Sequence, residues 1–113
     1  LFGDILTDLG AAIAGGMGLA AGANLNPERE FPSMFEPIHG SAPDIAGQGK
    51  ANPLATVWSA SQMLDFFGYR QWGEKLIDII EEILKEKKVL TPDLDGTATT
   101  SQVGDEVISK LRQ

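Results

Sequence analysis

The chain has 113 residues, of which 42% are hydrophobic and 22% charged, and its formal net charge is −7. This length allows one domain with a hydrophobic core, and the hydrophobic fraction excludes an acidic disordered tail. The acidic balance offers no basic stripe for a phosphate backbone, so we expect no nucleic-acid partner. No apolar run approaches a membrane span, so we expect no membrane partner. The chain contains no cysteine, which excludes disulfides and fits a reducing compartment, so we expect a cytoplasmic protein.

The first third of the chain predicts one helix and two weak strands. Apolar residues recur at helical spacing over residues 4–14, and a pair of glycines ends this helix. Residues 17–33 are rich in Gly, Ala, Asn and Pro, which predicts a loop with a short strand around residues 23–25. Residues 33–38 predict a second strand, which Pro37 interrupts.

The second half of the chain predicts three helices. Asn52 precedes a proline and reads as the N-cap of a helix over residues 53–67, whose apolar residues cover most of its circumference. A second helix, over residues 72–89, carries isoleucine and leucine on one face. Thr99 and Gln102 have the spacing of a capping box and predict the start of the last helix.

The predicted helices outnumber the predicted strands, although the glycine-rich loops are typical of strand ends. We therefore expect residues 1–113 to form a single partial domain of the α/β class, helix-rich, with a few strands of an incomplete sheet. We expect Trp58, Phe66 and Phe67 to belong to the core rather than to a stacking surface.

Two carboxylates in the first predicted helix form a candidate metal site. Asp4 and Asp8 are four residues apart, which places them one helical turn from each other on the same face. Their oxygens suit a hard divalent cation such as Mg²⁺ or Mn²⁺. The alternative is structural: Asp4 caps the helix and Asp8 is a solvated surface residue.

The most specific stretch is residues 36–45, with the sequence EPIHGSAPDI. The small residues at positions 40–42 would let backbone N–H groups reach a phosphate. The carboxylate of Asp44 could accept hydrogen bonds from a ribose diol, and its charge would repel a 2′-phosphate. The alternative is an ordinary structural turn in which His39 is a satisfied, non-functional residue.

Three ordered motifs, at residues 2–8, 36–45 and 51–53, resemble those of the β-decarboxylating dehydrogenases, the family of isocitrate and isopropylmalate dehydrogenases. The resemblance covers essentially the whole chain. Residues 26–29 (NPER) and 31–35 (FPSMF) look most like the tartrate/D-malate branch of that family. The implied fold is the C-terminal part of an isopropylmalate dehydrogenase-like fold.

The resemblance implies an oxidoreductase that uses NAD and Mn²⁺ or Mg²⁺ to decarboxylate a small 2-hydroxy acid oxidatively, with tartrate or D-malate as the substrate. Asp4 and Asp8 match the metal carboxylates of the family. The loop after the second predicted strand matches the one that wraps the adenosine half of the cofactor. The matched cofactor positions are His39, Gly40, Ser41, Ala42, Asp44, Ile45 and Asn52.

No catalytic residue is assigned in this chain. The substrate-binding arginines and the catalytic Tyr and Lys of the family belong to a segment N-terminal to the matched one, so we expect these 113 residues alone to be inactive. The family implies a homodimer for the full-length enzyme. Two alternatives remain: 3-isopropylmalate as the substrate, as in leucine biosynthesis, or a nucleotide-binding module without catalysis.

Overall fold

The computed structural model describes residues 21–30, 32–37 and 41–113. The helix expected over residues 4–14 lies outside this part of the chain. The described elements are β1 (Ala21–Asn24), β2 (Met34–Pro37), α2 (Leu54–Phe66), α3 (Arg70–Glu86), the 3-10 turn η2 (Pro92–Leu94) and α4 (Thr100–Leu111). Both expected strands are confirmed. The first strand begins at Ala21, two residues earlier than expected. Among the described helices, none has the length and apolar character needed to cross a bilayer.

Strands β1 and β2 pair as an antiparallel hairpin, in which Ala21 lies opposite Pro37 and Asn24 opposite Met34. The backbone N–H of Asn26 donates to the Ser33 hydroxyl oxygen at 2.8 Å and ties the two ends of the connecting loop together. Pro37 is the last residue of β2 and does not interrupt the strand within Met34–Pro37.

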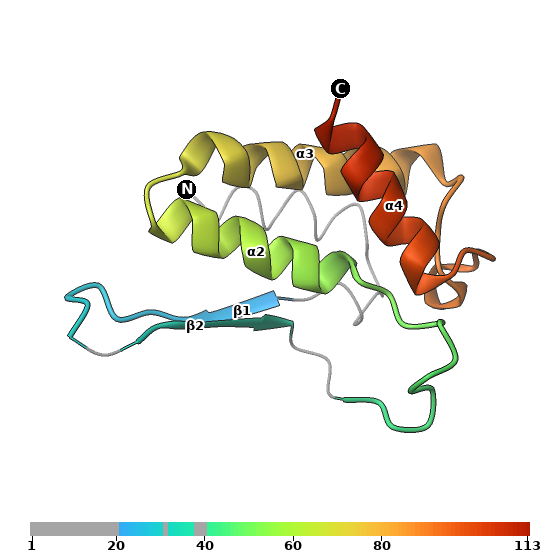
Figure 1. Cartoon of the computed structure of the whole chain (residues 1–113), viewed down its shortest axis with the longest axis horizontal. Helices are drawn as coiled ribbons and strands as arrows, with labels where there is room; N and C mark the ends of the chain where they lie inside the picture. Colours follow the sequence, from blue (N-terminus) through green and yellow to red (C-terminus); the bar gives the residue numbers. More distant parts are fainter. Residues whose placement is uncertain (1–20, 31, 38–40) are drawn as a thin grey trace.

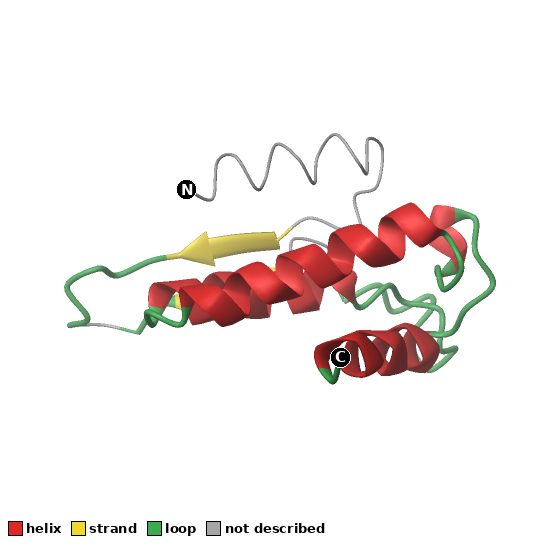
Figure 2. Cartoon of the chain, turned by 90° about the horizontal axis from the view of Figure 1, so that it is seen from above, coloured by secondary structure: helices red, strands yellow, loops and turns green. Residues whose placement is uncertain are grey.

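Helix α2 is the central element of the described structure. It packs against both strands on one side and against α3 on the other, and α3 in turn contacts α4 (Figure 1). Figure 2 shows the same arrangement from above, with α4 and the strands on opposite sides of α3. The helices therefore form a layer on the hairpin, as the α/β class predicts.

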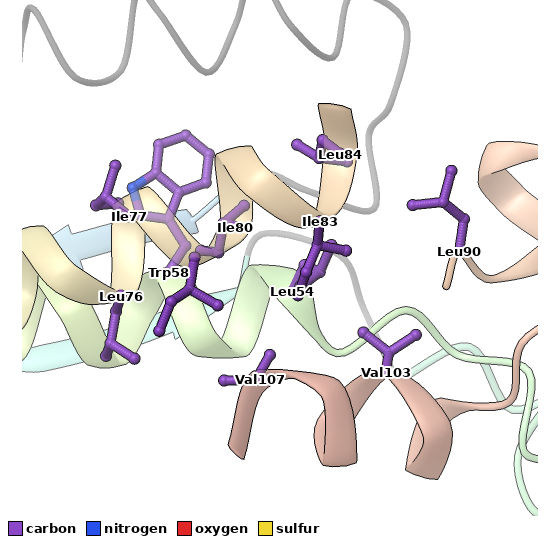
Figure 3. Close-up of a cluster of buried hydrophobic side chains, with 11 residues drawn as sticks. Leu54, Trp58, Leu76, Ile77, Ile80, Ile83, Leu84, Leu90, Val103 and Val107 are labelled. Carbon is purple, nitrogen blue, oxygen red and sulfur yellow. The ribbon is translucent and has the colours of Figure 1, made fainter. Parts of the chain in front are cut away.

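The hydrophobic core lies where the three helices meet (Figure 3). Leu54, Ile80, Ile83 and Val103 are each no more than 2% exposed. Burial of one such side chain stabilises the folded state by about 1.5–3 kcal/mol. The buried residues of the cluster are Leu54, Trp58, Leu76, Ile77, Ile79, Ile80, Ile83, Leu84, Leu90, Val103 and Val107.

The helix boundaries differ slightly from the predicted ones, for local reasons. Helix α3 ends at Glu86, three residues before the predicted end, because Lys87 adopts a left-handed conformation with φ 56° and its N–H donates to the Ile83 carbonyl oxygen. The predicted capping box of α4 is confirmed. The Thr99 N–H donates to Gln102 Oε1 at 2.8 Å, and the Gln102 N–H donates to Thr99 Oγ1 at 3.1 Å.

The expectation that Phe66 and Phe67 belong to the core is wrong, since neither is part of the hydrophobic cluster that contains Trp58. Trp58 is buried, but Phe67 is 50% exposed because it follows the last residue of α2, where the chain turns toward α3. The Arg29 guanidinium lies over the rings of Phe66 and Phe67, with 5.0 and 5.7 Å from its carbon to the ring centroids. Arg29 Nη2 also donates to the Phe66 carbonyl oxygen at 3.1 Å. These contacts of Arg29 therefore connect the loop between β1 and β2 to the C-terminal end of α2.

A backbone contact fixes the distance between α2 and α3. A Cβ atom added at Gly73 would lie 2.8 Å from the Ser61 carbonyl oxygen. The two buried serines of α2 are satisfied within the helix, since the Ser59 hydroxyl donates to the Ala55 carbonyl oxygen and the Ser61 hydroxyl donates to the Trp58 carbonyl oxygen. Polar side chains can therefore occupy this buried face without an unpaired hydroxyl.

Lys110 connects α4 to α3 through a cluster of carboxylates. Its Nζ lies 3.0 Å from oxygens of Glu82 and Glu86 and 3.6 Å from an oxygen of Glu106, and its side chain is only 6% exposed. The hydrogen bonds to Glu82 and Glu86 raise the pKa of Lys110 to about 12. The hydrogen bond from Lys110 lowers the pKa of Glu86 below its usual value of 4.5. Both charged forms are therefore favoured in the folded state.

We expect Lys110→Met to lower the thermal midpoint at pH 7 and to flatten its dependence on acid. The stabilisation from Glu86 is complete above pH 4.5 and disappears as the pH falls through its lower folded-state pKa. The stabilisation from Lys110 is complete below pH 10.5 and disappears as the pH rises through about 12. Circular dichroism melts at pH 7, 5 and 3.5 measure the effect, with the exposed Lys85→Met as control. Equal melting of the two variants at every pH would contradict the expectation.

Candidate functional site

A pocket of about 430 Å³ lies where the loop over residues 41–52 meets the turn after α3 and the start of α4. Four of the predicted cofactor residues line it: Ser41, Ala42, Ile45 and Asn52. The other residues of the loop that line it are Ala46, Gly47, Gly49, Lys50 and Ala51. The structure therefore brings residues between Ser41 and Asn52 of the predicted nucleotide loop around one pocket.

Tight turns give the loop its curved shape. The Ile45 N–H donates to the Ala42 carbonyl oxygen at 3.1 Å, and the Gln48 N–H donates to the Ile45 carbonyl oxygen at 3.2 Å. Gly47 and Gly49 have φ values of 79° and 69°, a region in which other residues are strained. A Cβ atom at either glycine would meet no atom within 4 Å, so these glycines are required by backbone conformation and not by crowding.

Helix α4 holds the end of the loop in place. The Thr100 N–H donates to the Gly49 carbonyl oxygen at 2.9 Å, and the Thr100 hydroxyl donates to the Ala51 carbonyl oxygen at 2.5 Å. Both bonds join residues about fifty positions apart in sequence. The start of α4 therefore fixes the wall of the pocket.

Asn52 is the most constrained polar side chain of the pocket. It is 8% exposed, and its Oδ1 accepts from the N–H of Leu54, the first residue of α2, at 3.0 Å. Its Nδ2 donates to Asp93 Oδ2 at 3.0 Å. The Thr91 hydroxyl donates to the other oxygen of the same carboxylate. The prediction that Asn52 is the N-cap is wrong: α2 begins at Leu54, one residue later than predicted, and its N-cap is Pro53. Asn52 lies one residue earlier and bonds to the first N–H of the helix.

The remaining predicted site residues stay predictions. Asp44 is exposed on the same turn but does not line the pocket, and its backbone carbonyl oxygen accepts from Gln48 Nε2 at 2.8 Å. Asp4, Asp8, His39 and Gly40 lie outside the described residues. Among the residues that the structure describes, no three His, Cys, Asp or Glu side chains come together as a metal site.

Sequence reasoning missed two residues that line the pocket from outside the loop, Asp93 and Thr100. Asp93 lies in a segment that reads only as a turn between two helices. Thr100 reads only as the first residue of α4, next to its N-cap. No local sequence pattern predicts that these two residues lie close to the loop, since 41 positions separate Asp93 from Asn52 and 49 positions separate Thr100 from Ala51.

The composition of the pocket suits the adenosine part of a nucleotide. Small residues leave the backbone accessible, Ile45 and Ala46 provide an apolar surface, and Asn52 offers an amide. An apolar cleft with a few fixed polar groups is typical of sites for small molecules and cofactors. The side chains that are present therefore fit the cofactor half that the resemblance implies.

Comparison with known proteins supports the same family. A family model described as isocitrate/isopropylmalate dehydrogenase matches residues 1–107. A probable tartrate dehydrogenase/decarboxylase of Bacillus subtilis is 50% identical over 113 residues, and a 3-isopropylmalate dehydrogenase of Thermobifida fusca is 52% identical over the same length. The alignments cover all of this chain but only 32% and 31% of those proteins, so the chain spans about a third of the length of these relatives.

A solved structure has the same fold. The crystal structure of isocitrate dehydrogenase from Methylococcus capsulatus superposes with a TM-score of 0.82 at 39% sequence identity, covering 100% of this chain and 33% of that one. The predicted α/β class, as part of an isopropylmalate dehydrogenase-like fold, is thereby confirmed. The family match, the identities and the shared fold lead to one conclusion: the chain belongs to the isocitrate/isopropylmalate dehydrogenase family.

Proposed function

We propose that this chain provides the adenosine side of an NAD site, and two metal carboxylates, to an enzyme that decarboxylates tartrate or D-malate oxidatively. The observation that carries the proposal is the pocket at residues 41–52, which is lined by four of the seven residues that the family resemblance assigns to the cofactor. The whole enzyme is proposed to act as a homodimer in the cytoplasm.

The residues of the chain have distinct parts in this proposal. The small residues Ser41 and Ala42 leave room for phosphates, and Ile45 and Asn52 surround the adenine. Asp44 binds the ribose diol and disfavours a 2′-phosphate. Asp4 and Asp8 hold Mn²⁺ or Mg²⁺ against the substrate. When bound, NAD supplies a hydride acceptor and the cation supplies positive charge next to the substrate oxygens.

The second candidate substrate is 3-isopropylmalate. It is favoured by one observation: the chain is 52% identical to the Thermobifida fusca 3-isopropylmalate dehydrogenase and 50% identical to the probable tartrate enzyme of Bacillus subtilis. The two substrates differ in the group distal to the reacting carbon. The protein of family length that carries this segment, assayed for NADH with Mn²⁺ and each of D-malate, tartrate and 3-isopropylmalate, distinguishes them. No turnover of any of the three would contradict the proposal.

Nucleotide binding can be tested on the 113 residues themselves. We expect the chain to bind 5′-AMP and NAD in isothermal titration calorimetry. Ala46→Trp places an indole in the pocket wall and is expected to weaken AMP binding at least about tenfold, since the ligand and the indole need the same space. Gln71→Trp, exposed on α3 and remote from the pocket, is the control. Equal affinities of the two variants would place the nucleotide elsewhere.

The metal assignment gives a separate expectation for the whole enzyme. We expect Asp8→Asn to raise the Mn²⁺ concentration for half-maximal activity at least about tenfold, because loss of groups that support a metal site costs about 10–100-fold in affinity. A manganese titration of the steady-state rate at saturating NAD measures it. Asp78→Asn, an exposed carboxylate on α3, serves as control. An unchanged titration would remove Asp8 from the metal site.

A further inference from the structure

We propose that Asp93 is a positioning residue of the nucleotide pocket: its carboxylate holds the Asn52 amide in the one orientation that leaves an N–H for an adenine nucleotide. This inference rests on the proposed function for the identity of the ligand. It concerns a residue in the turn after α3, a segment to which the family resemblance assigned no role.

The amide of Asn52 is oriented by two different partners. Its Oδ1 accepts from the backbone N–H of Leu54, a group that can only donate. Its Nδ2 donates to Asp93 Oδ2, a group that can only accept when ionised. A flipped amide would place two donors together at Leu54 and two acceptors together at Asp93. Only the observed orientation therefore satisfies both partners.

This orientation determines what Asn52 can offer to a ligand. An amide group carries two N–H donors, of which Asp93 takes one. Because Asn52 lines the pocket, the second N–H is available to a ring nitrogen or a ribose oxygen. Without Asp93, the amide keeps its bond to Leu54 but loses the partner that fixes its nitrogen.

Asp93 is itself held by the turn that carries it. The hydroxyl of Thr91, a residue 1% exposed, donates to the second carboxylate oxygen. The Thr91 carbonyl oxygen accepts from the N–H groups of Leu94 and Gly96, both at 3.0 Å. Both carboxylate oxygens of Asp93 thus accept hydrogen bonds, one from Asn52 and one from Thr91. A group held in this way transmits a fixed geometry to the pocket.

The test compares Asp93→Ala, Asp93→Asn and Asp95→Asn in the 113-residue chain, with 5′-AMP as the probe. We expect Asp93→Ala to bind AMP about tenfold more weakly, as for the loss of one oriented hydrogen bond. Asp93→Asn is expected to restore most of the affinity, because its amide oxygen can still accept from Asn52. Asp95→Asn removes a charge two residues away without a contact to Asn52 and is expected to match the parent.

A ligand-free readout separates this inference from the proposed function. In ¹⁵N-resolved NMR spectra without ligand, the side-chain NH₂ signals of Asn52 are expected to shift in Asp93→Ala and to remain near the parent positions in Asp95→Asn. Unchanged Asn52 signals, or unchanged AMP affinity in Asp93→Ala, would overturn the positioning role. A parent chain that binds neither AMP nor NAD would instead overturn the proposed function, and with it the nucleotide part of the inference.

Discussion

Replacement of Gly96 by alanine is expected to cost the folded state about 4 kcal/mol or more, a loss typical only of severe core or backbone disruption. A methyl group at Gly96 would overlap the carbonyl group of Leu90 and would lie 2.6 Å from the Leu90 Cβ atom. Leu90 is 9% exposed and belongs to the core, so its backbone cannot move away without unpacking its side chain. Urea unfolding followed by circular dichroism measures the loss.

A second glycine provides a matched control for this substitution. Gly104 lies within α4, and a Cβ atom there would meet no atom within 4 Å. Gly104→Ala is therefore expected to stabilise the chain by about 0.5–1 kcal/mol, the usual gain from replacing glycine in a helix. If both alanine variants unfold at the urea concentration of the parent, the contact between Gly96 and Leu90 is not as close as the structure indicates.

The second large effect concerns the choice of coenzyme by the whole enzyme. We expect kcat/KM with NAD to exceed that with NADP by at least about 100-fold, because placing like charges together costs several kcal/mol. The Asp44 carboxylate, exposed on the pocket loop, is the group expected to repel the 2′-phosphate. Asp44→Ser should narrow the ratio, chiefly by improving kcat/KM with NADP.

Steady-state kinetics with both coenzymes measure this ratio in the parent and in Asp44→Ser. Asp78→Ser, which removes the same charge from an exposed site on α3, controls for a change in overall charge. Equal efficiency with the two coenzymes in the parent would exclude the role of Asp44. If the ratio of kcat/KM with NAD to kcat/KM with NADP changes equally in Asp44→Ser and Asp78→Ser, the coenzyme preference depends on net charge and not on Asp44.

Periodicity and capping chemistry predicted the helices because both are properties of neighbouring residues. The isoleucines of α3 recur at helical spacing, and they are buried where the pattern places them. The capping box of Thr99 and Gln102 needs only residues three positions apart. The exposure of Phe67 was not predictable in this way, since it depends on how α2 ends and on Arg29, which bonds to its neighbour Phe66 across 37 positions.

The residues of the candidate site also differ in whether neighbouring residues or distant ones bring them to the pocket. Ser41, Ala42, Ile45 and Asn52 belong to one contiguous loop, so a sequence motif could identify them together. Asp93 and Thr100 reach the pocket only because α3 and the following turn bring the chain back to it. Their contribution is a result of tertiary packing, which a single sequence does not encode at fixed spacing.

The close approach of α2 to α3 limits how the molecule can move. With Gly73 against the Ser61 carbonyl group, sliding of one helix along the other would drive side chains into the neighbouring backbone. We therefore expect α2 and α3 to move together as one rigid body in any hinge motion of a larger protein. Adjustment of the nucleotide pocket then has to come from the loop, where Gly47 and Gly49 have open space around them and permissive backbone torsions.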